Sequence, residues 1–152
     1  MAKKILITGG AGFIAHHVID KILSTTDWEI ITLDRLDFSG NLNRLNEVVS
    51  SYPKIEQKRV RVVHHDLKAE LNPEITATIG RIDYISHLAA GSHVDRSISS
   101  PLNFVETNVI GTVAPGGAGR ATWLGTPHAA VTDREQLDLD RHRLSAELWP
   151  RR

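Results

Sequence analysis

The most constraining feature of this chain is a glycine-rich segment that lies between a short strand and a helix near the N-terminus. The apolar residues 5–7 lead into Thr8, glycines follow at positions 9, 10 and 12, and a helical apolar pattern comes next. Glycines let a backbone approach a phosphate closely, and the first turn of a helix offers free N–H groups and a positive dipole end. The strand–turn–helix context therefore predicts a site for the pyrophosphate of a dinucleotide.

Strand-like and helical stretches alternate along the first 112 residues. Strands are expected at residues 3–8, 28–34, 59–64 and 82–87, and helices at residues 12–25, 42–51 and 70–79 and from Pro101 onward. This last helix is expected to turn four apolar side chains to the core: Phe104, Val105, Val109 and Ile110. The pattern predicts an α/β fold, a Rossmann-like doubly wound parallel sheet with local strand order 3-2-1-4, truncated after about four strands.

In such a sheet the glycine turn, Asp34, Asp66 and residues 88–92 all fall at the carboxyl ends of strands, where ligands bind. Asp34 is expected to accept hydrogen bonds from the adenosine ribose, which favours NAD over NADP because a carboxylate repels a 2′-phosphate. Arg35 leaves the alternative open, since an arginine there can accommodate that phosphate. Asp66 is placed to meet the adenine edge.

Phe13 and Ile14 are interpreted as core side chains whose backbone N–H groups face the phosphates. The histidine pairs at residues 16–17 and 64–65 are poor chelates, because neighbours on a helix or strand point in different directions. We therefore expect no metal site.

Composition narrows the function classes. The formal net charge is zero, which gives no electrostatic case for nucleic acid or an anionic membrane, and no segment approaches the ~20 apolar residues of a membrane span. The chain has no cysteine, which excludes disulfides and suits a cytoplasmic protein.

The character of the chain changes after Thr112. Residues 1–112 are interpreted as the N-terminal part of a dinucleotide-binding domain, and residues 113–152 as a divergent tail, disordered or with a short helix near 132–149. From Val113 onward isoleucine and lysine are absent while Ala, Gly, Pro and Arg dominate. A frameshifted reading of GC-rich DNA and a fusion to an unrelated segment both remain open.

Residues 3–112 resemble the NAD-dependent epimerase/dehydratase family, the extended short-chain dehydrogenases/reductases. Residues 5–14 and 87–90 carry features shared across that family, whereas residues 40–42, 92–98 and 107–112 are more specific to its sugar-nucleotide 4,6-dehydratases. UDP-sugar 4-epimerases are the alternative within the family. The resemblance implies NAD as cofactor, a nucleotide sugar as substrate and a homodimeric parent enzyme.

The resemblance also implies roles for individual residues. The cofactor-binding set is Gly9, Gly12, Phe13 and Ile14 at the pyrophosphate; Asp34, Arg35, Leu36 and Asp37 at the ribose; Asp66 and Leu67 at adenine; and Leu88, Ala89, Ala90 and Thr107 at nicotinamide. Ser92 would reach toward the sugar nucleotide, and Asn108 matches an asparagine associated with the catalytic groups. The chain departs from the dehydratase pattern at Gly91, where glutamate is common, and at Arg35 and Asp37, which replace Lys and Thr.

In that family NAD oxidises the sugar at C4, water is eliminated across C5–C6, and the hydride returns at C6. The base is the tyrosine of a Tyr-x-x-x-Lys motif. Tyr52 and Tyr84 are the chain's two tyrosines, and Glu56 and Leu88 stand four residues after them. The sequence thus predicts a cofactor site without catalytic residues, either as part of a dehydratase or as a non-enzymatic binding module.

Overall fold

The computed structural model describes residues 2–37, 40–112 and 122–125. Its strands are β1 (Lys4–Thr8), β2 (Glu29–Asp34), β3 (Val60–His64), β4 (Tyr84–His87) and β5 (Thr122–Gly125). Its helices are α1 (Ala15–Thr25), α2 (Leu42–Ser50), α3 (Lys54–Gln57), α4 (Pro73–Ile79), α5 (Val94–Ser99), α6 (Pro101–Val105) and the π-helical turn η1 (Glu106–Ile110). The order of strands and helices is that of an α/β protein.

The strands form one parallel sheet in the order β3-β2-β1-β4-β5. Ile5 of β1 pairs with Ile30 of β2 on one side and with Tyr84 of β4 on the other. The predicted order of the first four strands is confirmed. Because all strands run the same way, their carboxyl ends share one edge of the sheet, where the chain leaves β1, β2, β3 and β4 for the loops that follow.

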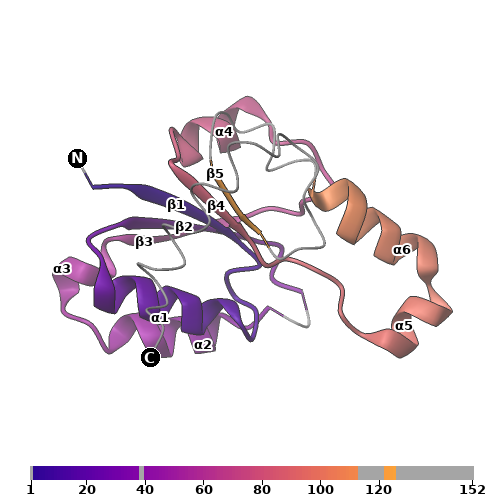
Figure 1. Cartoon of the computed structure of the whole chain (residues 1–152), viewed down its shortest axis with the longest axis horizontal. Helices are drawn as coiled ribbons and strands as arrows, with labels where there is room; N and C mark the ends of the chain where they lie inside the picture. Colours follow the sequence, from indigo (N-terminus) through magenta and orange to yellow (C-terminus); the bar gives the residue numbers. More distant parts are fainter. Residues whose placement is uncertain (1, 38–39, 113–121, 126–152) are drawn as a thin grey trace.

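Two apolar layers cover the sheet, and alternation along β1 separates them. Ile5 and Ile7 join the cluster made by α1 and α2, whereas Leu6 joins the cluster that includes Ile79 of α4. Figure 1 shows α1 and α2 below the sheet and α4 above it. These side chains are almost fully buried, so the central strands are held from both faces.

The glycine turn is longer than expected. Helix α1 begins at Ala15 rather than residue 12, because Gly12 N–H first closes a turn by donating to the Gly9 carbonyl at 2.9 Å. The prediction that Phe13 and Ile14 bury their side chains is wrong: they are 69% and 65% exposed. Both residues lie in the turn between β1 and α1, and their side chains join neither apolar cluster of the sheet.

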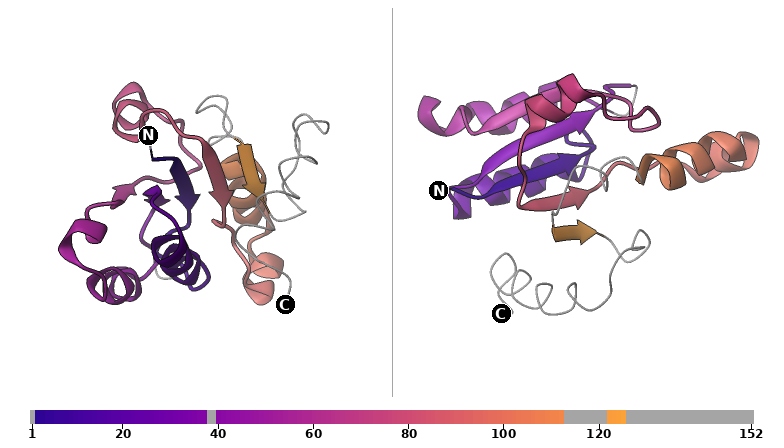
Figure 2. Two further views of the ribbon diagram at one scale, coloured as in Figure 1. Left: turned by 60° about the vertical axis from the view of Figure 1, so that its left-hand side comes forward. Right: turned by 90° about the horizontal axis from the view of Figure 1, so that it is seen from above.

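Helices α5, α6 and η1 form an arm (residues 94–110) that extends away from the sheet (Figures 1 and 2). The expectation that Val105, Val109 and Ile110 face the core is wrong, since they are 52%, 59% and 51% exposed. No residue within the three helices is buried. The apolar spacing is helical as predicted, but within the described residues no layer covers this face.

Three elements were not predicted. The short α3 follows Pro53, and α5 precedes the helix expected from Pro101 onward. β5 adds a fifth strand beside β4 in the segment interpreted as a tail. The predicted helix at 132–149 lies outside the described residues. Within the described part of the chain, no helix is long and apolar enough to cross a bilayer.

Candidate cofactor site

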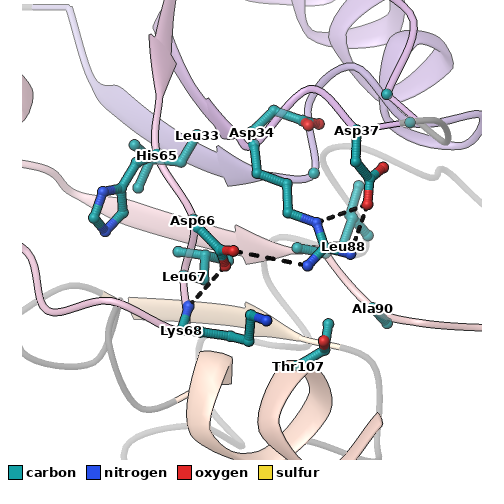
Figure 3. A pocket seen from close by; sticks show the side chains of 15 residues that line it. Leu33, Asp34, Asp37, His65, Asp66, Leu67, Lys68, Leu88, Ala90 and Thr107 are labelled. Carbon is teal, nitrogen blue, oxygen red and sulfur yellow. Dashed lines mark hydrogen bonds and ion pairs between the residues drawn. The ribbon is translucent and has the colours of Figure 1, made fainter. Parts of the chain in front are cut away.

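A crevice lies at the carboxyl ends of the strands, between the loops that follow β1, β2, β3 and β4. Its empty volume is about 620 Å³, including the part that opens to solvent. The lining residues are Gly9, Gly12, Leu33, Asp34, Arg35, Asp37, Gly40, His65, Asp66, Leu67, Lys68, Leu88, Ala89, Ala90 and Thr107 (Figure 3).

The glycine turn packs so tightly that larger residues do not fit. Gly9 has φ +71°, and a Cβ there would lie 2.8 Å from the backbone of Ala89. A Cβ on Gly12 would lie 2.9 Å from the Gly9 carbonyl oxygen. Ile14, at the N-cap of α1, makes no side-chain capping bond. The turn therefore leaves the start of α1 open to an anion, as a phosphate site requires.

Asp34 ends β2 with its side chain in the crevice and is 9% exposed. One carboxylate oxygen accepts the Ala11 N–H at 2.9 Å, and the other accepts the Leu36 N–H at 2.8 Å. A carboxylate has about four lone-pair sites, so each oxygen retains capacity for one more donor. These two bonds fix the carboxylate in one orientation, and two adjacent hydroxyls are suitable partners for it.

Arg35 contacts carboxylates on two loops, its own loop after β2 and the loop after β3. Its Nε and one terminal nitrogen lie 2.7 and 2.6 Å from the same oxygen of Asp37, and its other terminal nitrogen lies 3.8 Å from Asp66. Asp66 in turn accepts the Lys68 N–H at 3.0 Å. Figure 3 shows this bridge between the loops after β2 and β3.

On the opposite side of the crevice, Thr8 anchors the loop after β4. Its hydroxyl oxygen lies 3.2 Å from Leu88 N and 3.3 Å from Ala89 N, and it accepts from both. The hydroxyl proton can then be donated to His87 Nδ1, which lies 2.7 Å away. This loop is thus held at the buried end of β1.

His87 connects that loop to the helical arm. With Nδ1 accepting from Thr8, the neutral ring carries its proton on Nε2, which lies 3.1 Å from the Thr112 hydroxyl. The Thr112 hydroxyl donates to the Asn108 carbonyl at 2.7 Å. Burial lowers the pKa of His87, which favours the neutral ring that this chain of bonds requires.

Asn108 binds the backbone of Gly91 in both directions. Its Oδ1 accepts the Gly91 N–H at 2.7 Å, and its Nδ2 donates to the Gly91 carbonyl at 3.0 Å. Gly91 also lies against Phe104, since a Cβ there would come within 3.0 Å of the ring. The glutamate common at this place would therefore require the ring to shift.

A second, open hollow adjoins the crevice between this loop and the arm. Ser92 lines it together with apolar side chains of α5, α6 and η1, among them Val94, Phe104 and Val109. Ser92 is thus separated from the residues predicted to bind the cofactor, as its predicted substrate role would require.

Neither tyrosine lies in the crevice. The Tyr52 hydroxyl donates to Asp20 on α1, and the Tyr84 hydroxyl accepts a hydrogen bond from Lys3. Burial and the bond to Asp20 raise the pKa of Tyr52, which is the opposite of what a tyrosine base needs. Neither residue has the surroundings of a catalytic base.

The structure brings most of the predicted site residues together. Eleven of the fourteen predicted cofactor residues line the crevice; the others, Phe13, Ile14 and Leu36, lie in the adjoining turns. Sequence reasoning missed four lining residues: Leu33, Gly40, His65 and Lys68. Gly40 carried a signal, because a glycine shortly after the acid that ends a strand allows a close approach: a Cβ there would lie 2.8 Å from Asp34 Oδ1.

The chain is similar in sequence to sugar-nucleotide 4,6-dehydratases. The family model described as GDP-mannose 4,6 dehydratase matches residues 6–124, so the match continues beyond Thr112, where we expected the resemblance to end. The dTDP-glucose 4,6-dehydratase of Shigella flexneri is 35% identical over 144 residues, which is 95% of this chain and 37% of that protein. The chain thus spans about a third of the length of such relatives.

Solved structures share the fold. A dTDP-glucose 4,6-dehydratase from Streptomyces venezuelae, solved with NAD and TYD bound, superimposes with a TM-score of 0.63 at 37% identity, covering 76% of this chain and 35% of that one. A UDP-glucose 4-epimerase from Bifidobacterium longum, in complex with NAD+ and UDP, gives a TM-score of 0.60 at 25% identity, covering 76% and 33%. The predicted Rossmann-like class is confirmed, and both neighbours are NAD complexes.

Proposed function

Because the chain belongs to the GDP-mannose 4,6 dehydratase family, we propose that its crevice binds NAD as the cofactor site of a sugar-nucleotide dehydratase. The single observation that carries this proposal is Asp34. Its carboxylate lines the crevice, is fixed by the N–H groups of Ala11 and Leu36, and retains acceptor capacity on both oxygens. That arrangement suits the two hydroxyls of an adenosine ribose.

The rest of the crevice fits the same ligand. The glycines at 9 and 12 allow a tight turn that a Cβ at either position would disrupt, and the uncapped start of α1 supplies N–H donors from residues 13 and 14 for a pyrophosphate. Asp66 and Leu67 then border the adenine end, while Leu88, Ala89, Ala90 and Thr107 border the nicotinamide end. Bound NAD supplies hydride transfer.

For the substrate we propose a nucleotide sugar, held near Ser92. The hollow that contains Ser92 adjoins the nicotinamide end of the crevice, so a sugar there lies next to the cofactor ring. A dTDP-sugar is the first candidate, since dTDP-glucose 4,6-dehydratases are among the relatives. The chain contains no Tyr-x-x-x-Lys motif, so we expect it to bind cofactor without turning over dTDP-glucose.

Calorimetric titration of the purified chain with NAD tests the proposal. Asp34→Asn should weaken binding by about tenfold or more, because one backbone N–H and the ribose both lose an acceptor. Asp83→Asn is the matched control: Asp83 also accepts a backbone N–H, from Lys4 at 2.8 Å, but at the opposite edge of the sheet. Absence of NAD binding to the wild-type chain, or equal losses in both variants, would refute the proposed site.

A further inference from the structure

The feature that the proposed function leaves unexplained is the pairing of Arg35 with Asp37. An arginine directly after the acid that ends β2 is well placed to accept a 2′-phosphate. Here the guanidinium instead contacts one Asp37 oxygen through two nitrogens, at 2.7 and 2.6 Å, in a half-buried setting. The cation is engaged before any ligand arrives.

The pairing arises from the tight turn that separates the two residues. Leu36, the residue that separates them, has φ +55°, in the left-handed region, and its N–H donates to Asp34 at 2.8 Å. The side chains of Arg35 and Asp37 meet across this turn, and both residues line the crevice. By accepting the Leu36 N–H, Asp34 thus holds the turn that places Arg35 next to Asp37.

The charges around Arg35 also favour its pairing with Asp37 over contact with a 2′-phosphate. Three carboxylates line this end of the crevice, those of Asp34, Asp37 and Asp66, against the two cations of Arg35 and Lys68. Lys68 itself lies 3.9 Å from Glu106. A 2′-phosphate would have to compete with Asp37 for Arg35 and would place a dianion beside that carboxylate.

We propose that Asp37 determines cofactor specificity by holding Arg35 away from a 2′-phosphate, so that the crevice accepts NAD and rejects NADP. This inference rests on the proposed function, because it concerns the same adenosine site. It assigns to Asp37 a role distinct from that of Asp34: Asp34 binds the ribose hydroxyls directly, whereas Asp37 acts through Arg35.

The test measures the dissociation constants of NAD, NADP and adenosine 2′,5′-bisphosphate for the wild-type chain and its variants. Asp37→Asn should lower the NAD-over-NADP preference by about tenfold, the effect of an ordinary coupling between contacting residues. Asp66→Asn is the matched control, because its carboxylate lies farther from the guanidinium, at 3.8 Å. It should change the preference by less than about threefold.

A double variant separates release of Arg35 from simple removal of a negative charge. In an Arg35→Ala background, Asp37→Asn should give no gain in NADP binding, because no cation is left to release. A gain of equal size there, or an equal gain from Asp66→Asn, would overturn the inference in favour of general electrostatic repulsion.

The two proposals fail in different ways. If the wild-type chain binds no NAD, the proposed function is wrong, and the inference is then judged on adenosine 2′,5′-bisphosphate alone. Asp37→Asn must still create binding of that nucleotide, and Arg35→Ala must abolish it. If NAD binds but Asp37→Asn leaves the preference unchanged, only the inference is wrong.

Discussion

Helix α1, which packs on the sheet, and the helical arm both carry apolar side chains but are stabilised differently. Helix α1 buries four residues against the sheet: Ala15, Ile19, Ile22 and Leu23. Helices α5, α6 and η1 bury none, and Ile98 and Leu102 are each 77% exposed. The difference shows that helical spacing of apolar residues predicts a helix, whereas burial depends on a second layer.

Hydrogen bonds hold the arm in place, whereas apolar packing holds the helices that cover the sheet. Asn108 bonds to the Gly91 backbone, and Thr112 links the end of the arm to His87. Two small sets of hydrogen bonds thus position the arm beside the crevice. Four predictions test this contrast, in order of decreasing effect.

The largest effect is expected in the core beneath the crevice. Ile19→Ala, at a fully buried position of α1, should reduce the free energy of unfolding by about 2–5 kcal/mol, because it leaves a cavity between helix and sheet. Ile98→Ala in the arm is the control and should stay within about 0.5 kcal/mol. Urea denaturation measures both; equal losses would contradict the contrast.

The next effect concerns the glycine turn. Gly9 and Gly80 have nearly the same positive φ, +71° and +67°, but only Gly9 is crowded by the backbone of Ala89. Gly80, with ψ −159°, lies in a backbone region that essentially only glycine adopts, so Gly80→Ala should cost about 1–3 kcal/mol from backbone strain alone. Gly9→Ala should cost more and should also abolish NAD binding, because its Cβ displaces the loop after β4. Thermal unfolding and NAD titration measure the two effects, and equal stability losses with intact binding would argue against a tight turn.

A smaller, local effect is expected where the arm meets the crevice loop. Asn108→Ala removes both bonds to Gly91, which are exposed, at a cost of about 1 kcal/mol. Hydrogen exchange should accelerate in residues 91–110 but not in β1 or β2. Asn103→Ala on α6 is the control; the same acceleration in that variant would show that the Asn108 pair does not hold the arm.

The smallest effect is a pH dependence carried by His87. Burial lowers its pKa in the folded chain, so its neutral form stabilises the fold above the unfolded pKa of about 6.5. That contribution is lost as the pH falls below about 6.5 toward the lowered pKa, because only the unfolded state then gains a proton. Denaturation between pH 7.5 and 5 should show this loss, and His87→Gln should remove it. His17→Gln, on the exposed side of α1, should keep the wild-type slope; an unchanged slope in His87→Gln would refute the role of His87.

Much of the fold was predictable because strand-length apolar runs and acids at strand ends are local signals. The alternation in β1, with Ile5 and Ile7 to one side and Leu6 to the other, and the position of Asp34 follow from a few neighbouring residues. The exposure of Phe13 and Val109 depends instead on what packs against them. β5 was missed because four residues beside a glycine-rich stretch give too short a pattern, and its place beside β4 is a long-range contact.

The candidate site also contains residues that local patterns predict and residues that depend on the course of the chain. Asp34 and the glycines were predictable from spacing, whereas Lys68 and His65 enter the crevice through the loop after β3, whose course no short pattern specifies. The pairing of Arg35 with Asp37 depends on the positive φ of Leu36. This conformation is uncommon for leucine, so the sequence gives no signal for it.

Hydrogen exchange of the chain with and without NAD tests the central claim, that the carboxyl edge of the sheet holds the cofactor. The account predicts protection of residues 9–14, 34–37 and 65–68 when NAD is added, with little change in α5 and α6. Unchanged exchange in those three segments at saturating NAD, or protection confined to the arm, would contradict it.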